Sequence, residues 1–158
     1  MDAISQVNPP AETYQARVDD KGRLKLNADF QRYLKELGES QVYITTKDAK
    51  TVRIYPLSLW RKNEAAFNRA SEVDPDATEE TNLVMKHFGG YSDVDGSGRI
   101  LIPDRLRKFL QMEDTAVWLQ FYDGAINAMG DAQYQHKLAA ALERLTANVN
   151  KLQHLGLK

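Results

Sequence analysis

The chain of 158 residues contains no cysteine, and this absence limits the chemistry open to it. Without thiols it cannot form disulfides, zinc–thiolate centres or a thiol nucleophile, and its composition suits a reducing compartment. Long apolar runs are missing too, since no segment approaches the roughly 20 apolar residues that cross a membrane. We therefore expect a cytoplasmic protein with no membrane partner.

The chain also has no excess of positive charge. Its 21 Lys and Arg residues are matched by 22 Asp and Glu residues, which gives a net charge of −1 and a pI near 6.3. Domains that bind nucleic acid usually carry a clear basic excess, because they meet phosphate. Any nucleic-acid contact must therefore come from a local basic patch.

Recognisable catalytic and metal-binding motifs are absent as well. His87, His136 and His154 lie far apart on separate helical patterns, so they form neither a ligand cluster nor a nucleophile–base pair. The sequence contains no G-x-S-x-G, P-loop, dinucleotide-binding or H-E-x-x-H motif. We expect no enzyme activity, no cofactor and no resident metal.

The most informative feature is a pentapeptide that occurs twice, as Asp19-Asp20-Lys21-Gly22-Arg23 and as Asp95-Gly96-Ser97-Gly98-Arg99. Each copy precedes an alternating apolar strand and a short helical pattern, at an offset of 76 residues between Arg23 and Arg99. This repetition predicts two versions of one supersecondary unit. In each unit a glycine, Gly22 or Gly98, makes a tight bend between two strands. We expect Asp19 and Asp95 to orient the bend or to pair with the arginine.

The rest of the chain follows the same order twice: strand, bend, strand, helix, hairpin and helix. From residue 131 onward, leucines and a valine at heptad-like spacing predict one long helix, too short for a coiled coil, which packs on its own domain or on a neighbouring subunit. The predicted segments are a flexible tail (1–13), a first repeat (14–74), a linker helix (75–90), a second repeat (91–137) and a C-terminal helical extension (138–158).

Four cations gather around the first bend. If the period of two holds from Tyr14 to Leu26, one face carries the basic residues together with Asp19, and the opposite face carries the apolar residues. The basic residues are Arg17, Lys21, Arg23 and Lys25, and the apolar residues are Val18, Leu24 and Leu26. Such cations can contact phosphate, and an arginine can bind guanine through two hydrogen bonds. The alternative is an ordinary solvated strand face.

A calcium-binding loop is a second interpretation of the later copy. Oxygen-bearing side chains occupy positions 1, 3, 5 and 12 of an EF-hand pattern, at Asp93, Asp95, Ser97 and Asp104. Against this, Gly89-Gly90 ends the incoming helix and Pro103 occupies position 11. In the first copy, Arg17 and Lys21 occupy ligand positions, and cations cannot bind calcium.

Three stretches carry a family resemblance. They are the repeated D-x-x-G-R, the run Arg-Ile-Leu-Ile-Pro-Asp-Arg-Leu-Arg that begins at Arg99, and Ile54-Tyr55-Pro56-Leu57-Ser58-Leu59-Trp60. Over residues 14–137 the chain resembles the MraZ family of bacterial regulators, within the AbrB-like (SpoVT-AbrB) superfamily. The resemblance implies an α+β fold in which two tandem swapped-hairpin β-α-β-β repeats form a barrel with pseudo-two-fold symmetry, followed by a C-terminal helix.

The same resemblance implies a transcription factor that binds double-stranded DNA as a ring-like homo-oligomer. The ring would occupy repeated boxes near division and cell-wall genes, in the cytoplasm and at the nucleoid. Matching the motifs residue by residue makes Arg23 with Lys21 the principal DNA contact and Arg99 a secondary one, while Arg17 and Lys25 add attraction to phosphate. An assembly scaffold that has lost DNA binding is the remaining alternative, because the second copy is acidic.

Overall fold

The computed structural model describes residues 7–158, so residues 1–6 of the predicted flexible tail lie outside the described residues. Residues 7–13 form neither helix nor strand, but they touch the folded part of the chain. Pro10 is buried, and the Oγ1 atom of Thr13 lies 3.1 Å from the side-chain amide nitrogen of Gln120, which donates to it.

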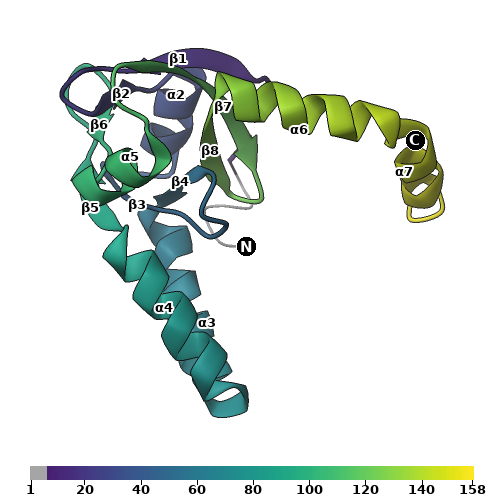
Figure 1. The fold of residues 1–158 in the computed structure, drawn as a ribbon, viewed down its shortest axis with the longest axis horizontal. Helices are drawn as coiled ribbons and strands as arrows, with labels where there is room; N and C mark the ends of the chain where they lie inside the picture. Colours follow the sequence, from purple (N-terminus) through teal and green to yellow (C-terminus); the bar gives the residue numbers. More distant parts are fainter. Residues whose placement is uncertain (1–6) are drawn as a thin grey trace.

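Eight strands form one antiparallel sheet that curves into a nearly closed barrel (Figure 1). Along the sheet the order is β5-β3-β4-β8-β7-β1-β2-β6. The two end strands, β5 and β6, follow one another in the chain, and the backbone N–H of Asp95 donates to the Arg99 carbonyl across the bend between them (2.9 Å). The strands are β1 (Tyr14–Val18), β2 (Arg23–Lys25), β3 (Gln41–Thr45), β4 (Val52–Pro56), β5 (Gly90–Asp93), β6 (Arg99–Leu101), β7 (Thr115–Tyr122) and β8 (Ala125–Gly130).

Alternation of apolar and polar residues builds the core of the barrel. Val18, Leu24 and Leu26 are buried, as the period-two pattern predicts. Strand β4 differs, because all five of its residues are buried. It lies between β3 and β8, and helices cover its outer side, so that even Arg53 is inside the molecule.

Six helices lie within the described residues: α2 (Ala28–Glu36), α3 (Leu57–Val73), α4 (Pro75–His87), α5 (Asp104–Leu110), α6 (Asp131–Glu143) and α7 (Leu145–Gln153). Helix α2 follows the predicted amphipathic pattern and buries Phe30, Tyr33 and Leu34. Asn27 occupies the N-cap position of α2, although its side chain accepts no hydrogen bond there.

Helices α3 and α4 form an antiparallel helical hairpin that projects from the barrel (Figure 1). At its base, Trp60 stacks on Tyr43 and packs with Tyr55 and Met85 in a second small core. The cap of α4 is Asp74, whose carboxylate accepts from the N–H of Ala77 at 3.1 Å. Asp76 and Glu79 have the spacing of a capping pair in the sequence, but Asp76 is not the cap, because the helix begins at Pro75.

The C-terminal segment is two helices and not the single long helix that the leucine spacing predicts. Helix α6 ends at Glu143, and α7 begins at Leu145 in a new direction (Figure 1). Only the start of α6 is fixed to the barrel, where Trp118 stacks on Tyr134 and its indole N–H donates to Asp131 at 2.8 Å. Of the two predicted arrangements, packing on the same domain does not extend beyond the start of α6, because Leu138, Leu142, Leu145 and Leu152 are exposed. Packing on a neighbouring subunit stays a prediction.

The two halves of the barrel exchange strands. Strand β1 pairs with β7 of the second half, and β5 pairs with β3 of the first half. Strands at equivalent places in the two units, β2 with β6 and β4 with β8, pair with each other. This arrangement confirms the predicted α+β class and the two swapped-hairpin units related by a pseudo-two-fold axis.

Candidate nucleic-acid interface

Strands β2 and β6 form a short antiparallel ribbon with one of the two bends at each end, because the Gly22 carbonyl accepts from the N–H of Ile102 and the Gly98 carbonyl accepts from the N–H of Leu26. Leu24 pairs with Ile100, which is its equivalent in the repeat, so the pseudo-two-fold axis passes between these two buried residues. On one side of this central rung Arg23 faces Leu101, and on the other side Lys25 faces Arg99. Because neighbouring side chains alternate across a strand, these four residues share the outer face of the ribbon.

The first bend is held by the carboxylate of Asp19. Its Oδ1 atom accepts from the backbone N–H groups of Lys21 (2.9 Å) and Arg23 (2.8 Å). The hydrogen bond from the Arg23 backbone, followed by that from Lys21, holds the pKa of Asp19 below its usual value, and the charges of Arg23 and Arg99 act in the same direction. Asp19 therefore shapes the loop and leaves the Arg23 side chain without an ion-pair partner.

The second bend repeats this arrangement and adds a contact. Oδ1 of Asp95 accepts from the backbone N–H groups of Ser97 and Arg99, each at 2.9 Å. Its Oδ2 atom also accepts from Nε of Arg99 at 3.1 Å. The hydrogen bond from the Arg99 backbone and those from Ser97 and the Arg99 side chain lower the pKa of Asp95 to about 2. Arg99 is thus held by a carboxylate that stays ionised at neutral pH.

Each bend is braced by a side chain from the other half of the molecule. Gly22 has a φ of +83°, and a Cβ atom there would lie 2.2 Å from the guanidinium of Arg107 on α5. Gly98 has a φ of +80°, and a Cβ atom would lie 2.1 Å from the side-chain amide of Gln31 on α2. Gln31 and Arg107 are equivalent positions of the repeat, and each donates to the carbonyl of the residue directly after a strand, Leu26 or Ile102. Neither brace was predicted from the sequence. The available signal was that Gln31 and Arg107 are separated by 76 residues, the same offset that relates the two motifs.

The predicted cations differ in what they contact. Arg17 lies on β1 and pairs with the Asp114 carboxylate at 2.7 Å, while Arg99 pairs with Asp95. Within the part of the chain that the structure describes, Lys21, Arg23 and Lys25 form no ion pair. Arg23 and Arg99 also line one shallow pocket of about 330 Å³, together with Asp93, Asp95 and Leu101. The structure therefore places four of the five cations on the ribbon or its first bend, and Arg17 on the neighbouring strand β1, which pairs with β2.

The oxygens of the calcium-like pattern have other partners. Asp104 pairs with Arg107 and Lys108 on its own helix, and Asp95 pairs with Arg99. The Oδ1 atom of Asp93 lies 3.4 Å from the Gln41 amide nitrogen. No group of three or more potential metal ligands occurs in residues 7–158. Calcium binding would thus require these carboxylates to break their ion pairs with arginine and lysine and their hydrogen bonds to N–H groups.

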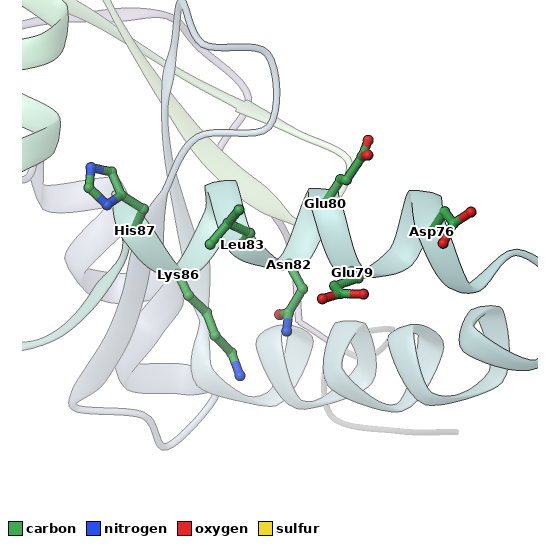
Figure 2. Close-up of a pocket in the computed structure, with 7 residues that line it drawn as sticks. All are labelled: Asp76, Glu79, Glu80, Asn82, Leu83, Lys86 and His87. Atoms are coloured by element: carbon green, nitrogen blue, oxygen red, sulfur yellow. The ribbon is translucent and has the colours of Figure 1, made fainter.

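A second surface hollow lies on α4, away from the ribbon. Figure 2 shows that its side chains all project from this one helix. The lining residues are Asp76, Glu79, Glu80, Asn82, Leu83, Lys86 and His87. None of the predicted site residues is among them, and the mixture of acids with single Lys and His residues is typical of a solvated helix face. None of the helices in the described part of the chain is both long and apolar enough to cross a membrane.

The exchanged strands, the two glycine bends and the nearly closed barrel define an AbrB-like barrel protein that carries both units in one chain. No family model matches the sequence. The chain is 38% identical over 104 residues to the transcriptional regulator MraZ of Acidobacterium capsulatum, covering 66% of this chain and 70% of that protein. The chain belongs to the MraZ family.

Two further relatives extend the match. The transcriptional regulator MraZ of Koribacter versatilis is 32% identical over 122 residues, which cover 77% of this chain and 76% of that protein. The protein of the same name from Thiobacillus denitrificans is 27% identical over 125 residues, covering 79% of this chain and 83% of its own. The predicted resemblance is therefore confirmed.

Proposed function

We propose that this protein is a non-enzymatic, sequence-specific DNA-binding regulator of transcription that contacts double-stranded DNA through the outer face of the β2–β6 ribbon. The observation that carries the proposal is the group of three cations, Lys21, Arg23 and Lys25, that form no ion pair in residues 7–158 of a slightly acidic protein. Leaving cations unpaired on one face favours an anionic partner such as phosphate. The names of the MraZ relatives agree with this role.

The two bends are proposed to contribute unequally. Arg23 is the principal contact together with Lys21, because no carboxylate competes for its guanidinium. Arg99 is secondary, since Asp95 accepts from its Nε atom and lowers the local positive charge. Leu101 stands where the first copy has Lys25, and its side chain is 51% exposed. Arg17 and Lys25 add attraction to phosphate without reading bases.

The small size of this basic face supports a multivalent mode of binding. A few cations on one subunit give weak affinity, whereas several copies held together gain from effective concentration. We therefore propose a ring-like homo-oligomer that binds repeated boxes. Division and cell-wall genes are the proposed targets, and the proposed location is the cytoplasm and the nucleoid.

Selection from random double-stranded DNA, followed by sequencing, tests this function. We expect enrichment of a short box that recurs at regular spacing, with affinity that falls steeply as salt rises. An assembled protein that enriches no sequence would contradict the proposal and would favour the scaffold alternative.

The role of Arg23 is tested on the selected DNA. We expect Arg23→Ala to abolish measurable binding, because the guanidinium supplies either a base contact or a phosphate contact at the ribbon. Arg69→Ala removes the same charge from the projecting helical hairpin and should leave affinity unchanged. Size-exclusion chromatography with light scattering should give the same assembly size for both variants. Equal affinity of assembled Arg23→Ala and wild-type protein would remove Arg23 from the site.

A further inference from the structure

We propose that a pocket between the barrel and the helical hairpin of α3 and α4 binds a small organic anion with an apolar body. This site lies apart from the ribbon and does not depend on the proposed DNA binding. It is lined by strand β4, by both helices of the hairpin, and by the turns after β3 and β7.

The anionic preference rests on Arg53. Its side chain belongs to the fully buried strand β4, and the residue is only 4% exposed. Its terminal nitrogens donate to two neutral oxygens, Oδ1 of Asn127 at 2.9 Å and the backbone carbonyl of Asp123 at 3.1 Å. No carboxylate in the described part of the chain lies within ion-pair distance of it. A buried guanidinium without a counter-ion is unusual, because burial of a charge is unfavourable unless it is paired.

The hydrogen-bonding capacity of Arg53 is also incomplete. A guanidinium has five N–H donors, and the hydrogen bonds to Asn127 and Asp123 use two of them. Its Nε atom is buried and has no acceptor. The central carbon of the group, Cζ, lies over the ring of Tyr55, 5.2 Å from the ring centre, and this cation–π contact stabilises its position. A carboxylate or phosphate accepts from two such donors at once, which makes it the matching ligand group.

The pocket next to Arg53 is large enough for a small molecule. Its volume is about 430 Å³, which is within the range of ligand-binding pockets. Apolar side chains form most of its wall: Tyr55, Leu59, Ala66, Phe67, Ala70 and Met85. This wall favours a ligand whose remaining part is apolar and flat enough to lie against Phe67 and Tyr55.

Arg53 is the dominant charge of the pocket, because the other two charged residues that line it have opposite signs. Lys47 and Asp123 both line the opening, both are exposed, and their charges offset each other. Asn63 and Thr81 supply neutral polar groups from the two helices. A ligand with a single negative head group therefore fits this pocket better than a dication or a neutral molecule.

The probe for this site is 2-naphthoate, and its neutral control is 2-naphthamide, which has the same ring. We expect millimolar 2-naphthoate to raise the melting temperature of the full-length protein and to give saturable heat in titration calorimetry. We expect 2-naphthamide to do neither. Equal responses to both compounds, or no response to either, would overturn the proposal.

Two substitutions locate the binding. Arg53→Met keeps the length and apolar stem of the side chain but removes the charge, and it should abolish the response to 2-naphthoate. Because that change is buried, a second variant is needed that leaves Arg53 intact. Ala66→Trp places a large ring in the pocket from an exposed helical position, and it should block binding.

The matched control is Ala65→Trp, on the same helix but outside the pocket lining. We expect it to keep wild-type affinity for 2-naphthoate. If Ala66→Trp binds as tightly as Ala65→Trp, the ligand lies elsewhere and the assignment of this pocket is wrong.

Discussion

Asp19 and Asp95 hold equivalent bends, yet only Asp95 also pairs with the arginine of its own motif. This difference lies in one oxygen atom, since Oδ1 makes the same backbone contacts in both copies. The chemistry of the two loops is therefore separable by substitutions that keep Oδ1 and change only Oδ2.

Asp95→Asn tests the contribution of the carboxylate to stability. The pKa of Asp95 is about 2 in the folded protein, against 3.8 for the ordinary group. A lowered pKa adds stability that is complete above pH 3.8 and is lost as the pH falls towards 2. We expect Asp95→Asn to make the free energy of unfolding less dependent on pH in this window, as measured by urea denaturation. An unchanged pH dependence would contradict this account of the bend.

Gly22→Ala tests the brace at the first bend. Its positive φ disfavours any Cβ atom by about 1–2 kcal/mol, and the new methyl group would also displace Arg107. We expect a loss of at least that size in the free energy of unfolding. Gly130→Ala is the control, because its φ is −65° and no atom lies within 4 Å of the added Cβ. Its cost should stay within about 0.5 kcal/mol. A further Arg107→Ala change should recover part of the loss at Gly22, and additive effects would show that the two residues do not interact.

Among the elements, the strands and bends were predictable because their signals are local. Val18 and Leu24 alternate with charged residues, and Gly22 falls where the chain must turn, so a short window of sequence contains the whole pattern. The break at Arg144 was missed, because the leucine spacing continues across it. A spacing pattern reports which side chains share a face only if the helix is continuous.

The long-range contacts of the site could not be predicted. The brace from Arg107 to Gly22 and the burial of Arg53 depend on strand pairing between distant segments. In the sequence, Arg53 resembles an ordinary outward-facing residue of a hairpin strand. Nothing in its local pattern indicates that α3 and α4, which follow in the chain, pack beside it. The roles of Arg23 and Arg99 in binding DNA remain predictions.

Truncation after Arg144 tests how far α7 is independent of the barrel. None of the residues in α7 is buried, and the helix follows the part of α6 that leaves the barrel. We expect the variant that ends at Arg144 to have the wild-type urea midpoint within error, as monitored by far-UV circular dichroism. A lower midpoint would show that α7 stabilises the folded barrel in solution.

At the scale of the whole molecule, the exchanged strands make the two halves depend on each other. Strand β1 has its long pairing with β7, and β3 pairs with β5, so neither half retains its sheet alone. Both halves also contribute to one core, which contains Leu24 and Ile100 side by side. The barrel should therefore unfold as one cooperative unit.

The two tryptophans report on this cooperativity separately. Trp60 lies in the first half and Trp118 in the second, and the sequence contains no other tryptophan. In Trp60→Phe and in Trp118→Phe, the remaining tryptophan should show a fluorescence transition that coincides with the circular dichroism transition of the same variant. Two separated transitions in either variant would show that the halves unfold independently.

The pairing of β2 with β6, its equivalent in the second unit, also gives the ribbon a direction. Two identical chains joined at this axis would present the same residues on both rungs, and would suit a palindromic sequence. In a single chain the equivalent positions are free to diverge, and here one rung holds Arg23 with Leu101 while the other holds Arg99 with Lys25. The two rungs of the recognition face thus differ in charge, because the rung of Arg99 and Lys25 holds two cations with Asp95 beside them, and the rung of Arg23 and Leu101 holds one unpaired cation. If the ribbon binds DNA as proposed, each subunit should distinguish a box from its reverse complement, so that an array of boxes would orient every subunit the same way.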